Sequence, residues 1–375
     1  MRSKRIDEFE GMRGPLALWV VLGHAANMMV LAVPAPLPRD LSGRSAVDVF
    51  IMLSGFVITL LLVEKREPFA PYLVRRFFRL FPVFFVCLVL SAALIPVATD
   101  ALLAAPETPA TPGRLRLLGY ASDNLVAHFL AHLTMLHGLL DPVLQGATFT
   151  IVGQAWSISV EWQFYIWAPF VVRLFVQRKW LWALPVAAVP ALYFAGATGS
   201  GFLSAHVHLF AIGMATYVLW RRLSSGALQW SALHVAGLSL AVLAVGWWIL
   251  DRPAIVIWAI GSHIVLAKAA GVDGPAERAA SSMLTSRPMM WLGRISYSVY
   301  LAHMIVLYPL LALCNRLRTT PGQQALCLGV GGVAGTLLLS AVLFRWVEIP
   351  GMRLGTQLSK RLPPSPASSA EGGPS

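Results

Sequence analysis

An arginine and a histidine stand eleven residues apart in the segment GMRGPLALWVVLGHAANMM. A helix turns about 100° and rises about 1.5 Å per residue, so Arg13 and His24 share one helix face, about 16 Å apart along it. Arginine binds phosphate through a fixed fork of donors, and histidine can accept a proton from a hydroxyl near neutral pH. The spacing therefore suits a long phosphorylated donor that delivers a reactive tip into a membrane. The structural alternative is that His24 is a core histidine bonded to a neighbouring helix.

A second group of cations occurs in the segment RRFFRLFP. Arg75 and Arg79 are spaced i, i+4 on one helix face, and Arg76 lies beside them. Guanidinium groups arranged in this way can clamp a phosphate or a pyrophosphate. The alternative is that these residues only orient the chain in a membrane.

Polar side chains are dense at the start of the apolar stretch QAWSISVEWQFYIWAP, which contains Glu161. Because polar groups at lipid depth are costly, this density indicates either a polar cavity or a hydrogen-bonded packing network. Asp48 in VDVFIMLSGFVIT either pairs with a buried arginine or lies at the membrane interface. The residues that we predict to bind substrate are Asp48, Ser157, Ser159, Gln163, Tyr165, Tyr297, Tyr300 and His303.

Two histidines, His128 and His132, have the i, i+4 spacing of a zinc pair. No glutamate nearby completes a metalloprotease motif, and the three cysteines of the chain form no CxxC pair. We therefore predict no metal site and no disulfide.

These residues must be positioned by membrane helices. The chain has 375 residues, of which 57% are hydrophobic and 12% charged, about half the charged fraction of a soluble protein. Apolar stretches of 18 or more residues recur along it, which predicts an all-α, polytopic integral membrane protein. We expect about ten transmembrane helices, at 16–33, 45–63, 79–98, 156–176, 180–197, 203–220, 232–250, 253–270, 295–314 and 325–345.

The distribution of positive charge predicts how the chain crosses the membrane. With ten spans and a cytoplasmic N-terminus, the inner segments contain 22 lysines and arginines and the outer loops seven. This asymmetry places both termini in the cytoplasm and accounts for the net charge of +12 without nucleic-acid binding. An eleventh span at 123–140 would move Arg178 and Lys179 outside, so we expect that stretch to lie in-plane or re-enter. Residues 1–358 then form one membrane domain, and 359–375 a disordered cytoplasmic tail.

Six segments in this order resemble the membrane acyltransferase 3 family, from about residue 5 to residue 353. They are the Arg13 to His24 segment, VDVFIMLSGFVIT, RRFFRLFP, WSISVEWQFY, GRISYSVYLAH and WVEIP. The resemblance implies transfer of an acyl group, most often acetyl, from cytoplasmic acyl-CoA to a hydroxyl of a carbohydrate. The implied acceptors are O-antigen, exopolysaccharide, a lipid-linked glycan or a glycosylated metabolite. Many members have two acidic residues where this chain has Glu161 and Trp162.

The resemblance also implies that His24 and Arg13 are essential and that Arg75, Arg79 and Glu161 are functional. On this hypothesis His24 is the general base, and the arginines, Arg76 included, hold the nucleotide phosphates. Polar groups of the 157–165 segment supply oxyanion donors. Glu161 either orients His24 or binds the acceptor. Both direct transfer and relay through an acyl-histidine remain open.

A protein of a different class also fits the pattern. A plasma-membrane transporter of a sugar or lipid-linked glycan would also combine about ten spans with polar intramembrane residues. The sequence contains no inverted repeat and no pair of Gly/Pro-broken helices at matching positions, which are typical of transporters. Acyl transfer is therefore the function that the sequence favours.

Overall fold

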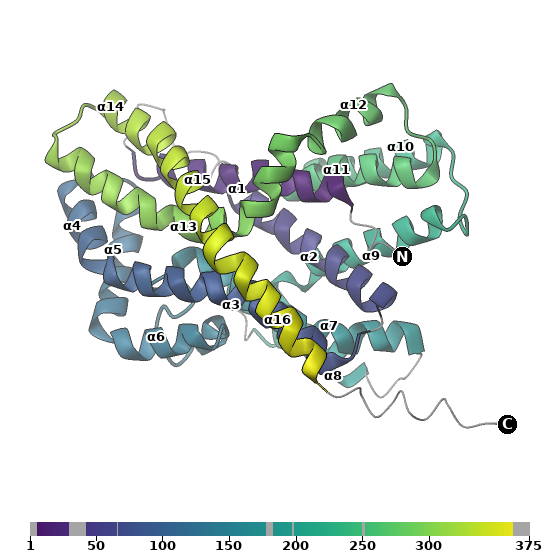
Figure 1. Cartoon of the computed structure of the whole chain (residues 1–375), viewed down its shortest axis with the longest axis horizontal. Coiled ribbons are helices and arrows are strands. Elements are labelled where there is room, and N and C mark those ends of the chain that lie inside the picture. The colour runs from purple at the N-terminus through teal and green to yellow at the C-terminus, as the bar shows by residue number, and fades with distance from the viewer. Residues whose placement is uncertain are drawn as a thin grey trace.

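A computed structural model describes residues 6–29, 43–65, 67–177, 183–196, 199–249 and 252–362 (Figure 1). These residues form helices and turns with no strand, which confirms the all-α prediction. The α-helices are α1 (Asp7–Ala26), α2 (Arg44–Lys65), α3 (Phe69–Ala93), α4 (Ile95–Ala104), α5 (Thr111–Asp123), α6 (Leu125–Leu133), α7 (Trp156–Gln177), α8 (Ala183–Phe194), α9 (Val207–Ser224), α10 (Ala232–Ala244), α11 (Pro253–Ala270), α12 (Pro275–Leu284), α13 (Arg287–Arg316), α14 (Pro321–Leu326), α15 (Gly332–Leu343) and α16 (Ile349–Arg361).

Several helices are long and apolar enough to cross a membrane. Among the described residues there are five, and six if α3 and α4, which are bent by 54°, count as one span. The chain is therefore a membrane protein, but the expected count of about ten is not reached by length and composition. Four expected spans do not meet these criteria, because α1 and α7 carry charged and other polar residues and α8 and α10 are short. The five helices that are long and apolar enough are Arg44–Glu64, Leu203–Ser224, Pro253–Ala270, Arg287–Arg316 and Pro321–Arg361.

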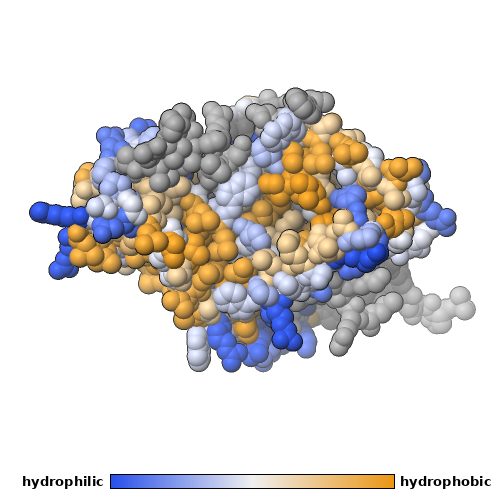
Figure 2. Space-filling view, turned by 90° about the horizontal axis from the view of Figure 1, so that it is seen from above, coloured by the Kyte–Doolittle hydropathy of each residue, from blue (hydrophilic) through white to orange (hydrophobic). Residues whose placement is uncertain are grey.

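Apolar side chains cover much of the face seen from above, and hydrophilic residues gather toward its rim (Figure 2). On the helical run Pro321–Arg361, Leu326, Leu338 and Trp346 are 64%, 72% and 73% exposed. Large apolar side chains in this number would be unfavourable in water and are stable against lipid. The exposed side chains thus agree with a lipid-facing surface.

The most extensive helix pairing joins α1 to the first half of α13. A Cβ added at Gly14 would lie 2.5 Å from the Leu292 Cβ, and one at Gly293 would lie 1.9 Å from the Glu10 carbonyl oxygen. Only glycine permits this backbone contact, as in other close membrane-helix pairs. The two helices run in the same direction, so successive turns of α1 meet successive turns of α13.

A second glycine contact fixes α2 against α9. A Cβ at Gly213 would lie 1.9 Å from the Met52 carbonyl oxygen, and one at Gly55 would lie 2.3 Å from that of Phe210. Ser54, next to Gly55, hydrogen-bonds across to Glu161 on α7. The glycines of α2 therefore help to place one wall of a polar pocket.

The last helical run extends beyond the predicted span at 325–345. A π-type turn at Phe344–Glu348 precedes Pro350 and accommodates its missing N–H, so the helix continues to Arg361. This run appears in yellow across the front of the molecule (Figure 1). The predicted tail thus begins in helix at 359–361, and residues 363–375 lie outside the described part of the chain.

The ambiguous stretch at 123–140 contains α6, a helix of nine residues, followed by a short 3₁₀ turn. A nine-residue helix is about 13 Å long and cannot cross a bilayer core of about 30 Å. This agrees with the expectation that 123–140 does not span.

Candidate active site

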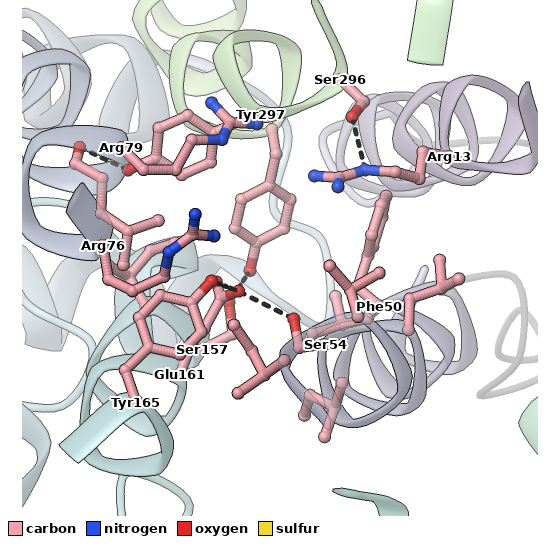
Figure 3. A pocket seen from close by; sticks show the side chains of 18 of the residues that line it. Arg13, Phe50, Ser54, Arg76, Arg79, Ser157, Glu161, Tyr165, Ser296 and Tyr297 are labelled. Atoms are coloured by element: carbon pink, nitrogen blue, oxygen red, sulfur yellow. Dashed lines mark hydrogen bonds between the residues drawn. The ribbon is translucent and has the colours of Figure 1, made fainter. Parts of the chain in front are cut away.

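A polar pocket of about 840 Å³, including space open to solvent, lies between α1, α2, α3, α7 and α13 (Figure 3). The guanidinium of Arg13 enters it from one side and those of Arg76 and Arg79 from the other, with Tyr297 between them. The pocket is therefore a cationic chamber inside a largely apolar molecule. Its polar lining consists of Arg13, Ser54, Arg76, Arg79, Ser157, Glu161, Tyr165, Ser296, Tyr297 and Tyr300.

Two of these arginines lack a carboxylate partner among the described residues. Arg13 donates through Nε to the Ser296 hydroxyl at 3.3 Å. Arg76 lies 6.0 Å from the ring centroid of Tyr165, and its buried Nε has no hydrogen-bond partner within the described chain. Both groups are available to bind an anion.

The other two arginines of the RRFFRLFP segment are held by acids. Arg79 pairs with the buried Glu348, whose second oxygen accepts a hydrogen bond of 2.6 Å from Ser298. Arg75 pairs with Glu67, donates to Ser359, and does not line the pocket. The structure therefore does not bring Arg75 and Arg79 together as a phosphate clamp. The i, i+4 spacing could not reveal Glu348, which is 269 residues away in the chain.

Glu161 lies in the wall opposite Arg13. It accepts a hydrogen bond of 2.7 Å from Ser54 and another from Tyr165. Nearby, the Tyr300 hydroxyl donates its one hydrogen to the Gln154 carbonyl at 2.5 Å. The Ser157 hydroxyl, 2.8 Å from the Tyr300 oxygen, must therefore be the donor in that second hydrogen bond. The polar density of the 157–165 segment thus belongs both to a cavity and to a packing network.

Four predicted substrate-binding residues lie outside the pocket: Gln163, Ser159, Asp48 and His303. Gln163 donates to the Gly201 carbonyl at 2.7 Å and accepts from the Leu203 N–H at 2.9 Å. Ser159 accepts from the Gly138 N–H at 3.2 Å. Asp48 is buried near the end of α2 that carries Arg44. The first two therefore tie α7 to neighbouring loops, and their polar groups are already engaged.

His24 lies apart from the pocket, farther along α1. Its ring is 4.9 Å from that of His303, and the Nδ1 of His303 is 2.7 Å from the Tyr300 carbonyl oxygen. Because a carbonyl can only accept, Nδ1 carries the proton and the neutral ring presents a lone pair at Nε2. Arg13 and His24 thus both contact α13, and Tyr300 connects the pocket to the histidine pair.

Two functional candidates were not expected from the sequence. Glu348 lies in the WVEIP segment with Arg345 and Arg353 close in the chain, yet its partner is Arg79. Arg114 lies near the histidine pair, where its charge acts on both rings. The sequence around these two residues does not predict their partners, because both contacts join distant parts of the chain.

Most of the chain matches a known protein family. A family model described as an acyltransferase domain, of the acyltransferase 3 type, matches residues 6–345. Nodulation protein 10 of Rhizobium leguminosarum bv. viciae is 25% identical over 383 aligned positions, which cover 95% of each chain. Peptidoglycan O-acetyltransferase OatA of Listeria monocytogenes is 27% identical over 390 positions, 92% of this chain and 56% of its own length. No solved structure gives a significant match.

Proposed function

The chain belongs to the acyltransferase 3 family and is a membrane O-acyltransferase, and from this premise we propose its substrates and its catalytic groups. The donor is a cytoplasmic acyl-CoA, with acetyl as the acyl group. The acceptor is a hydroxyl of a carbohydrate, from a surface polysaccharide, a lipid-linked glycan or a glycosylated metabolite. The name of the Listeria relative, an O-acetyltransferase of peptidoglycan, supports both acetyl and a glycan.

The observation that carries this proposal is the pair of uncompensated guanidiniums, Arg13 and Arg76, in one pocket. Two such groups suit the phosphates of coenzyme A. His24 lies eleven residues beyond Arg13 on the same helix, about 16 Å farther along. A donor anchored at the arginines therefore extends its thioester along α13 toward the histidines.

In the proposed reaction His24 acts as the general base. It takes the proton of the acceptor hydroxyl as the oxygen attacks the thioester carbonyl. Glu161, held by Ser54 and Tyr165, lines the donor pocket and is better placed to order that chamber than to orient His24. Direct transfer is favoured because no serine or cysteine lies in a nucleophile elbow.

We place the protein in the plasma membrane with both termini in the cytoplasm. Adding α1, α7, α8 and α10 to the helices that pass the length and polarity criteria gives ten spans. Among the polar residues of α1 and α7, Arg13, Ser157, Glu161 and Tyr165 line the pocket. A helix that faces a cavity can carry such residues at membrane depth.

The experiment uses the full chain in lipid nanodiscs, with acetyl-CoA labelled in the acetyl group and glycans from cells that make the protein. The wild-type protein should move label into glycan, and His24→Ala should not. His234→Ala, at an exposed position on α10, is the matched control and should keep full activity. Label transfer by a correctly folded His24→Ala protein would contradict the assignment of the base.

A further inference from the structure

Arg114 on α5 completes a second polar centre beside the histidine pair. Three polar residues, His24, His303 and Arg114, come from different helices. Four residues after each of them, about one helical turn along, lies a buried residue, and these three buried residues belong to a single apolar cluster. Those members are Met28, Leu307 and Leu118 respectively. The three polar groups therefore border one apolar region, near the last turn of α1, the first turn of α5 and the middle of α13.

The polar atoms of this centre are buried and unsatisfied. His24 Nδ1, His303 Nε2 and Arg114 Nη1 have no hydrogen-bond partner among the described residues. No carboxylate in the described part of the chain pairs with Arg114, whose charge instead acts on His24, His303 and Tyr308. A guanidinium nitrogen that is buried without a partner or a counter-charge is costly, so its persistence points to a negative charge that forms there.

The segment expected to donate to the oxyanion does not supply free donors. Ser159 and Gln163 are engaged with neighbouring loops, and Ser157 is bonded to Tyr300. Among the described lysines and arginines, Arg114 is the one whose charge acts on His24. An oxyanion that forms next to the base lies within the field of this guanidinium.

We propose that Arg114 is the oxyanion-stabilising residue of the acyl transfer, an inference that rests on the proposed function. The acceptor oxygen forms a bond to the thioester carbonyl carbon, and its proton passes to His24. The carbonyl oxygen becomes an oxyanion that Arg114 stabilises. The oxyanion then collapses, the carbon–sulfur bond breaks, and the protonated His24 returns the proton to the coenzyme A sulfur.

The test measures kcat and KM for labelled acetyl-CoA in nanodiscs, with the same glycans as acceptor. Arg114→Gln should lower kcat by about 10²- to 10³-fold, the usual effect of removing one oxyanion donor, with KM for acetyl-CoA unchanged. Arg116→Gln removes an exposed guanidinium from the same helix and should leave kcat unchanged. Added methylguanidinium should restore part of the rate to Arg114→Ala but not to His24→Ala.

Each outcome decides between the two proposals. A wild-type protein that transfers no acetyl group contradicts the proposed function itself. If the wild type is active and Arg114→Gln keeps its kcat, the oxyanion role is wrong and the function stands. A rise in KM for acetyl-CoA at constant kcat would make Arg114 a donor-binding residue and overturn the inference. A loss of folding in Arg114→Gln without rescue of Arg114→Ala would show that the role is structural.

Discussion

The carboxylate of Glu348 pairs with the guanidinium of Arg79, although 269 residues separate them. This pair joins α16 to α3, and Ser298 on α13 donates to the same carboxylate. Glu348 is 1% exposed, so the pair is shielded from water. The pair therefore neutralises one arginine of the pocket wall and fixes the long C-terminal helix against the core.

Removing one partner of this pair should destabilise the protein strongly. Glu348→Gln leaves Arg79 charged and partly buried, a change that typically costs about 3–5 kcal/mol. We expect a lower Tm in thermal unfolding of the detergent-solubilised protein. Glu107→Gln, at an exposed position, removes the same charge and should leave the Tm unchanged.

A double-variant cycle separates the ion pair from simple loss of packing. If the two charges interact, Arg79→Gln with Glu348→Gln should be less destabilised than the sum of the single variants. Strict additivity of the two effects would contradict the pairing.

The sequence predicted the helical class and the order of the polar segments because both depend on local patterns. The eleven-residue spacing of Arg13 and His24 needs only helix geometry, and both residues do contact α13. The number of spans was harder to predict, because α1 and α7 replace apolar residues with the polar groups of the pocket. Composition alone cannot distinguish such helices from segments that stay outside the membrane.

The partners of the arginines could not be predicted for a different reason. The i, i+4 spacing suggested that Arg75 and Arg79 act together, yet Arg75 turns to Glu67 and Arg79 to Glu348. The partner of Arg79 depends on which segment packs against α3, which is a long-range property, whereas Glu67 lies close to Arg75 in the chain. Arg13 and Arg76 were both predicted to hold phosphates, but neither segment indicates that these two, on different helices, are the ones without an acidic partner.

Donor binding should depend on Arg13 and Arg76 more than on Arg75. Lysine retains the charge but loses the two-donor fork, so Arg13→Lys and Arg76→Lys should each weaken coenzyme A binding by about tenfold, or about 1.4 kcal/mol. Arg75→Lys is the control and should bind normally, since Arg75 does not line the pocket. Titration calorimetry with coenzyme A measures all three. Equal weakening by Arg75→Lys would contradict the assignment of the pocket.

Backbone contact between α1 and α13 should make Gly293 intolerant of any side chain. The added methyl group of Gly293→Ala would lie 1.9 Å from the Glu10 carbonyl oxygen, so the helices must separate. We expect a marked fall in Tm and loss of acetyl transfer, because Arg13 and His24 both depend on this pairing. Gly322→Ala adds the same group where no atom lies within 4 Å. A Gly293→Ala protein as stable as Gly322→Ala would be inconsistent with the close pairing.

The central claim is that a donor anchored at Arg13 and Arg76 places its acyl end at His24. Bromoacetyl-CoA, whose reactive carbon replaces the acetyl methyl group, tests this most directly. Mass spectrometry should find the alkyl group on His24 or His303, and excess coenzyme A or the Arg13→Lys change should suppress it. Alkylation confined to other residues, or undiminished by coenzyme A, would contradict the account.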